Sequence, residues 1–160
     1  MPNPIRKNYT PAQALSKAQK YCAYQERSHP EVRGKLYSFG LWKKEVEEIL
    51  TQLIISGFLN EERFAKAFAG GKFRMKKWGR NKIENELKQR GISSKCIQIG
   101  LKEIDERDYR KTLTQLVRKK ALAVAEDNLF KKRSKVANFV VGKGYEPELV
   151  WSLILDLLPG

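Results

Sequence analysis

The chain of 160 residues carries 32 lysines and arginines against 18 aspartates and glutamates, which gives a formal net charge of +14 at pH 7. So large a positive charge favours a polyanionic partner such as nucleic acid, an acidic protein groove or an anionic membrane surface. The hydrophobic share of 41% is enough to build buried cores, so the composition argues against a disordered chain.

The few cysteines and the single histidine narrow the possible classes of protein. Cys22 and Cys96 lie far apart on apolar stripes, which predicts buried free thiols in a reducing compartment. Two scattered cysteines and the single His29 cannot supply a zinc site, and we expect no cofactor. The chain shows no signal peptide and no run of about 18 apolar residues, so we expect a cytoplasmic protein that does not contact membranes.

Helix signals begin after a short N-terminal segment. Residues 1–9 contain two prolines and no periodicity, which predicts a flexible arm. Thr10-Pro11-Ala12-Gln13 and Ser28-His29-Pro30-Glu31 are typical capping boxes with proline in the first turn. The second of these helices is expected to end at Gly40. A third helix, expected to end at Gly57, carries the apolar residues Val46, Ile49, Leu50 and Leu53.

The same order of signals recurs twice. A helix is expected from about Glu61, preceded by the cap Asn60, and it breaks at Trp78-Gly79. The next helix is expected to end at Gly91, and a serine then caps a third. A looser copy follows, with a long helix, a second one that ends near Gly144, and a last one that starts at a proline.

Three of these glycines anchor an internal repeat. Gly40, Gly91 and Gly144 are separated by 51 and 53 residues, and the same six offsets around each of them hold apolar residues. These residues are Val32, Ile83 and Val136; Leu36, Leu87 and Val140; Leu41, Ile92 and Tyr145; Val46, Ile97 and Val150; Leu50, Leu101 and Ile154; and Leu53, Ile104 and Leu157. Amphipathic helices alone would not keep this register across a turn.

We therefore predict an all-α protein of three tandem three-helix repeats at residues 10–58, 59–104 and 105–158. Each repeat has too little apolar surface to be stable alone. Neighbours should therefore pack into an elongated, curved rod, right-handed or solenoid-like. The sequence contains no P-loop, no HExxH and no cysteine–histidine pair with a supporting acid, so we expect that the protein is not an enzyme.

Positive charge is densest in the middle repeat, where residues 72–90 hold eight cations against two glutamates. We expect charge contacts with a polyanion from Arg27, Lys72, Arg74, Lys76, Lys77, Arg80 and Lys82, and from Lys131, Lys132 and Arg133 at the matching place in the third repeat. These cations form either one basic stripe along the rod or separate solvated clusters.

Several nearby residues allow two interpretations. Trp78 either stacks on a base or packs between repeats. Arg63 either faces a partner or pairs with Glu61 or Glu62. Residues 118–120, which are all basic, are expected to be a solvated helix face. Three similar copies without an evident recognition helix favour salt-sensitive contact that ignores base sequence.

The motifs together resemble the RecX family of bacterial regulatory proteins, over residues 10–157 and most weakly in the third repeat. The matching segments are Gly57-Phe58-Leu59-Asn60-Glu61 with Arg63-Phe64-Ala65; Lys77-Trp78-Gly79-Arg80-Asn81-Lys82-Ile83 with Glu86-Leu87 and Arg90-Gly91-Ile92; and Arg27-Ser28 with Glu31-Val32 and Lys35-Leu36.

This resemblance implies a fold of three tandem three-helix repeats. It also implies a protein that binds RecA and its nucleoprotein filament and inhibits ATP hydrolysis, strand exchange and coprotease activity, in DNA recombination, repair and the SOS response. Direct contact with single- or double-stranded DNA would be weak, and we expect a monomer. The residues alone also allow a stand-alone, sequence-nonspecific DNA- or RNA-binding protein, or a protein-interaction scaffold without nucleic acid.

Overall fold

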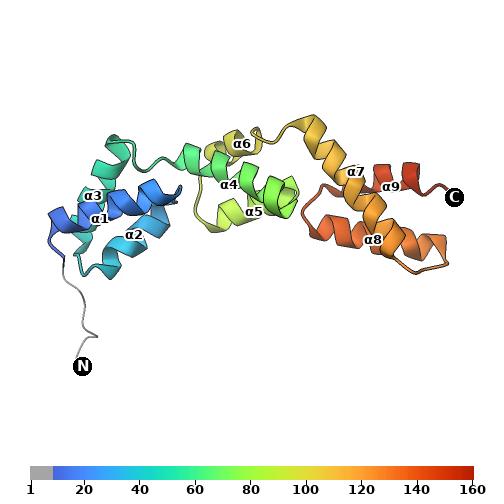
Figure 1. Ribbon diagram of the computed structural model, residues 1–160, viewed down its shortest axis with the longest axis horizontal. Coiled ribbons are helices and arrows are strands. Elements are labelled where there is room, and N and C mark those ends of the chain that lie inside the picture. The colour runs from blue at the N-terminus through green and yellow to red at the C-terminus, as the bar shows by residue number, and fades with distance from the viewer. Residues whose placement is uncertain (1–8) are drawn as a thin grey trace, which may run out of the picture.

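The computed structural model describes residues 9–160, and these form nine α-helices and no strand. The first group is α1 (Pro11–Tyr24), α2 (His29–Ser38) and α3 (Lys43–Ile55). The second is α4 (Glu61–Lys76), α5 (Arg80–Gln89) and α6 (Ser94–Leu101), and the third is α7 (Glu106–Ala123), α8 (Leu129–Gly142) and α9 (Pro147–Leu157). The groups follow one another along the long axis (Figure 1), which confirms the predicted all-α rod of helical repeats.

The predicted caps start the helices. The Gln13 backbone N–H donates to the Thr10 hydroxyl at 3.2 Å, and the Gln13 side chain accepts from the Thr10 N–H at 3.0 Å. Ser28 forms the same reciprocal arrangement at the start of α2. Asn60 accepts from the Arg63 N–H at 2.8 Å at the start of α4. Each cap satisfies N–H groups that the first helical turn leaves without a partner.

The glycines end helices as expected. Gly40, Gly57, Gly91 and Gly144 have φ values of 84°, 83°, 76° and 104°. Side chains with a Cβ are strained in this left-handed region, so glycine suits these turns. The predicted arm lies outside the described residues except for Tyr9, whose N–H donates to the Phe39 carbonyl oxygen at 3.2 Å.

The repeat register corresponds to the buried face of each group. All eighteen residues at the six offsets are buried except Leu101 and Leu157, which are half-buried. They belong to two hydrophobic cores. One lies within α1–α3 and includes Leu59, and the other is shared by α4–α9. Both cysteines are free thiols, Cys22 buried and Cys96 half-buried.

Backbone groups join the second repeat to the third. The Gly79 N–H donates to the Lys143 carbonyl oxygen at 2.8 Å, and the Asn81 N–H donates to the Gly144 carbonyl oxygen at 2.9 Å. The Tyr145 hydroxyl donates to the Lys77 carbonyl oxygen at 3.0 Å. These bonds and the shared core link the two repeats. Among the described residues, no helix is long and apolar enough to cross a bilayer.

Candidate binding surface

Arg80 lies at the joint between the second and third repeats. Its guanidinium pairs with Glu146 at 2.9 Å and with Glu106, and lies 3.8 Å from the centroid of the Tyr109 ring. The Tyr109 hydroxyl accepts from the Arg80 backbone N–H at 3.0 Å and donates to Glu146. Burial raises the pKa of the Tyr109 hydroxyl, and the hydrogen bond to Glu146 raises it further, so this group stays a neutral donor.

The charge of Arg80 is therefore neutralised inside the protein. Only 23% of its side chain is exposed, and its two carboxylate partners come from the third repeat. The sequence predicts that Arg80 offers its charge to a polyanion. The structure gives it instead a positioning role at the joint, which reversing its charge would disrupt.

Two arginines in the first half of the chain, Arg27 and Arg63, also have partners within the protein. The side chain of Arg27 is 13% exposed, lies 3.7 Å from the Tyr21 ring centroid and pairs with Glu31 at 3.8 Å. Arg63 pairs with Glu26 of the first repeat and donates to the Phe58 carbonyl oxygen at 3.2 Å.

The expected partners of Arg63 bond elsewhere. Glu61 accepts from the Ser93 backbone N–H at 2.6 Å, and Glu62 pairs with Lys66 at 3.3 Å. Pairing of Arg63 with either glutamate is therefore wrong, and its ion pair joins two repeats instead.

Trp78 is half-buried and packs in the second repeat. Its ring lies edge-on to Phe68 with centroids 6.5 Å apart. The Lys72 and Lys82 ammonium groups lie 5.0 Å and 4.6 Å from the Trp78 centroid. The ring thus fixes two of the predicted contact lysines beside it through cation–π attraction.

The three cations at the start of α8 differ in their contacts and exposure. Arg133 donates to the Leu158 carbonyl oxygen at 2.8 Å and 2.5 Å and so holds the end of α9. Lys131 is exposed, and Lys132 lines a hollow beside Leu122 and Leu158. The hollow beside Lys132 shares no residue with the hollow that Lys76 lines.

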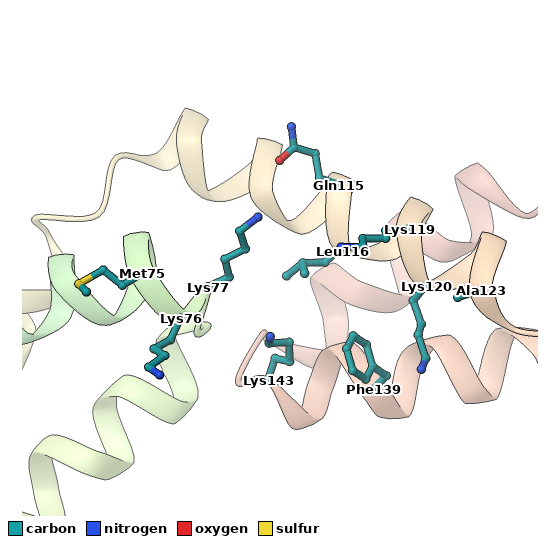
Figure 2. A pocket seen from close by; sticks show the side chains of 10 residues that line it. All are labelled: Met75, Lys76, Lys77, Gln115, Leu116, Lys119, Lys120, Ala123, Phe139 and Lys143. Atoms are coloured by element: carbon teal, nitrogen blue, oxygen red, sulfur yellow. The ribbon is translucent and has the colours of Figure 1, made fainter.

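A cationic hollow lies between the end of α4 and the helices α7 and α8 (Figure 2), with a volume of about 420 Å³. We call it the lysine hollow. Its lining residues are Met75, Lys76, Lys77, Gln115, Leu116, Lys119, Lys120, Ala123, Phe139 and Lys143. Five of the ten are lysines and none is acidic, so the hollow should attract anions strongly.

The five lysines come from three segments that are distant in sequence. Lys76 and Lys77 end α4, Lys119 and Lys120 lie near the end of α7, and Lys143 follows α8. Within residues 9–160 none of the five forms an ion pair. Their positive charge is available to a partner.

Arg74 points to a neighbouring surface. It lines a third hollow, next to the lysine hollow, with Lys77 and Lys111, and there Asp108 adds a negative charge. Lys77 lines both hollows, so Arg74 lies beside the lysine hollow without belonging to it.

Comparison with known proteins gives a consistent result. A family model described as "RecX, second three-helix domain" matches residues 60–101. "Regulatory protein RecX" of Prosthecochloris aestuarii is 26% identical over 91% of this chain and 93% of that protein. The protein of the same name from Clostridium tetani is 30% identical over 88% of this chain and 65% of its own length. The crystal structure of RecX from Lactobacillus salivarius, 22% identical, superposes with a TM-score of 0.83 over 92% of this chain and 96% of that one. This chain is similar to RecX-family proteins over most of its length.

RecX-family proteins differ in length. The chain spans 56% of "Regulatory protein RecX" of Lactobacillus johnsonii, to which it is 27% identical. The similarity to the Lactobacillus salivarius structure shows that the RecX-family fold extends over all three repeats, including the third, where the motifs are weakest.

The sequence indicates only part of the lysine hollow. It predicts polyanion contacts for Lys76 and Lys77, whereas it predicts a solvated helix face for Lys119 and Lys120. Phe139 and Lys143 carry no signal in the sequence. Lys76 and Lys77 lie at the end of α4, whereas Lys119 and Lys120 belong to α7 in the next repeat. Only the packing of α4 against the third repeat therefore brings these two pairs of lysines to one hollow.

Proposed function

We propose that this chain is a regulatory protein that binds RecA and the RecA–single-stranded-DNA filament. It lowers the ATPase, strand-exchange and coprotease activities of RecA in DNA recombination and repair. Similarity to the RecX family, whose relatives are named regulatory proteins, supports this proposal. It acts by binding as a cytoplasmic monomer, without catalysis of its own.

The observation that carries the proposal is an elongated rod (Figure 1) with an unneutralised cationic hollow between the end of α4 and the helices α7 and α8. A rod of this kind can contact more than one protomer of a filament. The joint at Arg80 keeps the second and third repeats in one arrangement, so a filament bound to both cannot move freely beneath them. ATP hydrolysis and strand exchange require such movement, and binding would restrict it.

The direct test is the single-stranded-DNA-dependent ATPase rate of RecA, titrated with this protein at moderate salt. We expect the rate to fall at substoichiometric amounts of the protein. Binding of the protein to the same DNA without RecA is the control, and it should be weak at those concentrations. An unchanged ATPase rate would refute the proposal and leave the fold as described.

A second candidate function is sequence-nonspecific nucleic-acid binding without RecA. The unpaired lysines around the lysine hollow favour it. In that case inhibition would appear only when the protein coats the DNA, and added free DNA would relieve it. The titration distinguishes these functions because filament binding depends on RecA concentration and simple coating depends on DNA concentration.

A further inference from the structure

The hollow beside Lys132 lies at the C-terminal end of the rod, where the end of α7, the start of α8 and the end of α9 meet (Figure 1). We call it the end hollow, and its volume is about 320 Å³. Its floor is apolar and comes from Val117, Ala121, Leu122, Leu157 and Leu158, and its two charged lining residues are Arg118 and Lys132. We infer that the end hollow docks a helical segment of a partner protein, one that carries apolar side chains with carboxylates beside them.

Uncovered apolar surface at the end of the rod is the first argument. Leu122 is 90% exposed in the last turn of α7, and Phe130 is 75% exposed in the first turn of α8. Proteins built of stacked repeats usually close with a repeat whose outer face is polar, because that face meets water. An apolar end face therefore marks a surface that another protein covers.

The joint between the second and third repeats shows what such a surface accepts. There the end of α4 and the start of α5 hold the following repeat. Phe73 of α4 packs on Tyr109 with ring centroids 5.8 Å apart. Arg80 of α5 pairs with Glu106 and Glu146. Each repeat has the same order of helices, so the end of α7 and the start of α8 correspond in the third repeat to these two helix ends.

The segment that occupies the joint is mainly the start of a helix. Glu106 and Tyr109 lie in the first turn of α7, three residues apart, and therefore share one face. The ring packs on α4 while the carboxylate pairs with α5. Negative charge is also favoured in the first turn of a helix. The same pattern in a partner would place an apolar side chain in the end hollow and a carboxylate at its rim.

The rim of the end hollow supplies the matching positive charge. Arg118 and Lys132 line it together with no carboxylate. Within residues 9–160 neither of these cations forms an ion pair. Lys132 lies near the start of α8, much as Arg80 lies at the start of α5, where carboxylates of the following repeat neutralise it. Charge complementarity thus favours an acidic amphipathic helix.

This inference goes beyond the proposed function, which depends on the lysine hollow. The two hollows share no lining residue. The floor of the end hollow is aliphatic, so it offers no aromatic face on which a nucleic-acid base could stack. An aliphatic floor suits the apolar anchor of a protein helix.

The test measures the fluorescence anisotropy of two labelled peptides of about 18 residues, long enough to form helices alone. One peptide has leucines on one face and glutamates on the other, and the second has the same glutamates with glutamine in place of leucine. The full-length chain should bind the leucine peptide about tenfold more tightly, because only this peptide can fill the apolar floor. The pair separates docking from the attraction of any acidic peptide to a chain of charge +14.

The apolar floor has its own pair of variants. Leu122→Glu should weaken binding of the leucine peptide about tenfold and leave the circular dichroism spectrum unchanged, because this side chain is 90% exposed. Ile55→Glu makes the same change of charge at a residue 81% exposed at the end of α3, and it should leave binding nearly unchanged.

The cationic rim has a matched pair as well. Arg118→Gln with Lys132→Gln should weaken binding of the leucine peptide severalfold, because the carboxylates of the peptide lose their partners. Lys119→Gln with Lys120→Gln removes the same charge from the lysine hollow and should have little effect on this peptide.

Four results would overturn the inference. Equal binding of the two peptides would mean attraction by charge alone. Equal losses in Leu122→Glu and Ile55→Glu would exclude docking at the end hollow. A dimer in sedimentation equilibrium that Leu122→Glu dissociates would make a second copy of the chain the occupant. Leu122→Glu should also keep full inhibition of RecA, and loss of inhibition would assign the end hollow to the RecA interface. Failure of the peptide measurements alone would leave the proposed function standing.

Discussion

The joint between the second and third repeats depends on the absence of a side chain at Gly79. This residue has a φ of −78°, which any amino acid can adopt, so its backbone conformation does not require glycine. A Cβ at this position would lie 2.3 Å from the Gly144 carbonyl carbon and oxygen and from the Tyr145 nitrogen. These are backbone atoms that cannot rotate away, so Gly79→Ala must push the two repeats apart.

The cost can be worked from the contacts. Separation breaks the bonds from the Gly79 N–H to Lys143 and from the Asn81 N–H to Gly144, and each is worth about 1 kcal/mol. Overpacking of a well-filled interface adds about 1–3 kcal/mol. We expect Gly79→Ala to lower the free energy of unfolding by about 3 kcal/mol, since partial relaxation offsets some of this sum.

Urea denaturation followed by far-ultraviolet circular dichroism measures the change. Gly71→Ala is the matched control, because Gly71 lies inside α4 and a Cβ there would have open space within 4 Å. Alanine is the better helix former, so this control should gain about 0.5–1 kcal/mol. If Gly79→Ala costs less than about 1 kcal/mol, the joint is not tightly packed and the reasoning fails.

Three further predictions use other parts of the molecule. Phe64→Ala should lower the free energy of unfolding by about 3–4 kcal/mol by leaving a cavity in the shared core, and a loss under about 0.5 kcal/mol would mean that Phe64 is not core. Burial raises the pKa of Tyr109 and of Tyr145 above the ordinary value near 10, so the unfolded chain releases these protons first. Stability should therefore hold below about pH 10 and fall above it in urea titrations, and less steeply in Tyr145→Phe; a flat profile would contradict this. Reversing Lys76 and Lys77 to glutamate should abolish RecA inhibition with the circular dichroism spectrum unchanged, and full inhibition by this variant would exclude these lysines from the interface.

The sequence alone determined the local structure of this protein. Capping at Thr10 and Ser28 involves residues three apart, and helix ends at Gly40 and Gly91 depend on the backbone freedom of one residue. The apolar register also follows from spacing, because each repeat must bury the same face. These signals are contained within a few residues and can be interpreted without knowledge of the neighbouring repeats.

The tertiary structure decided which cations are available. Arg80 pairs with Glu146, 66 residues away, and Arg63 pairs with Glu26, 37 residues away. The net charge of +14 gives no means of separating these neutralised cations from Lys77, which has no ion pair within the described residues. Whether a lysine or arginine can bind a partner depends on which carboxylates the packing of repeats brings within hydrogen-bond distance, and no local pattern carries that information.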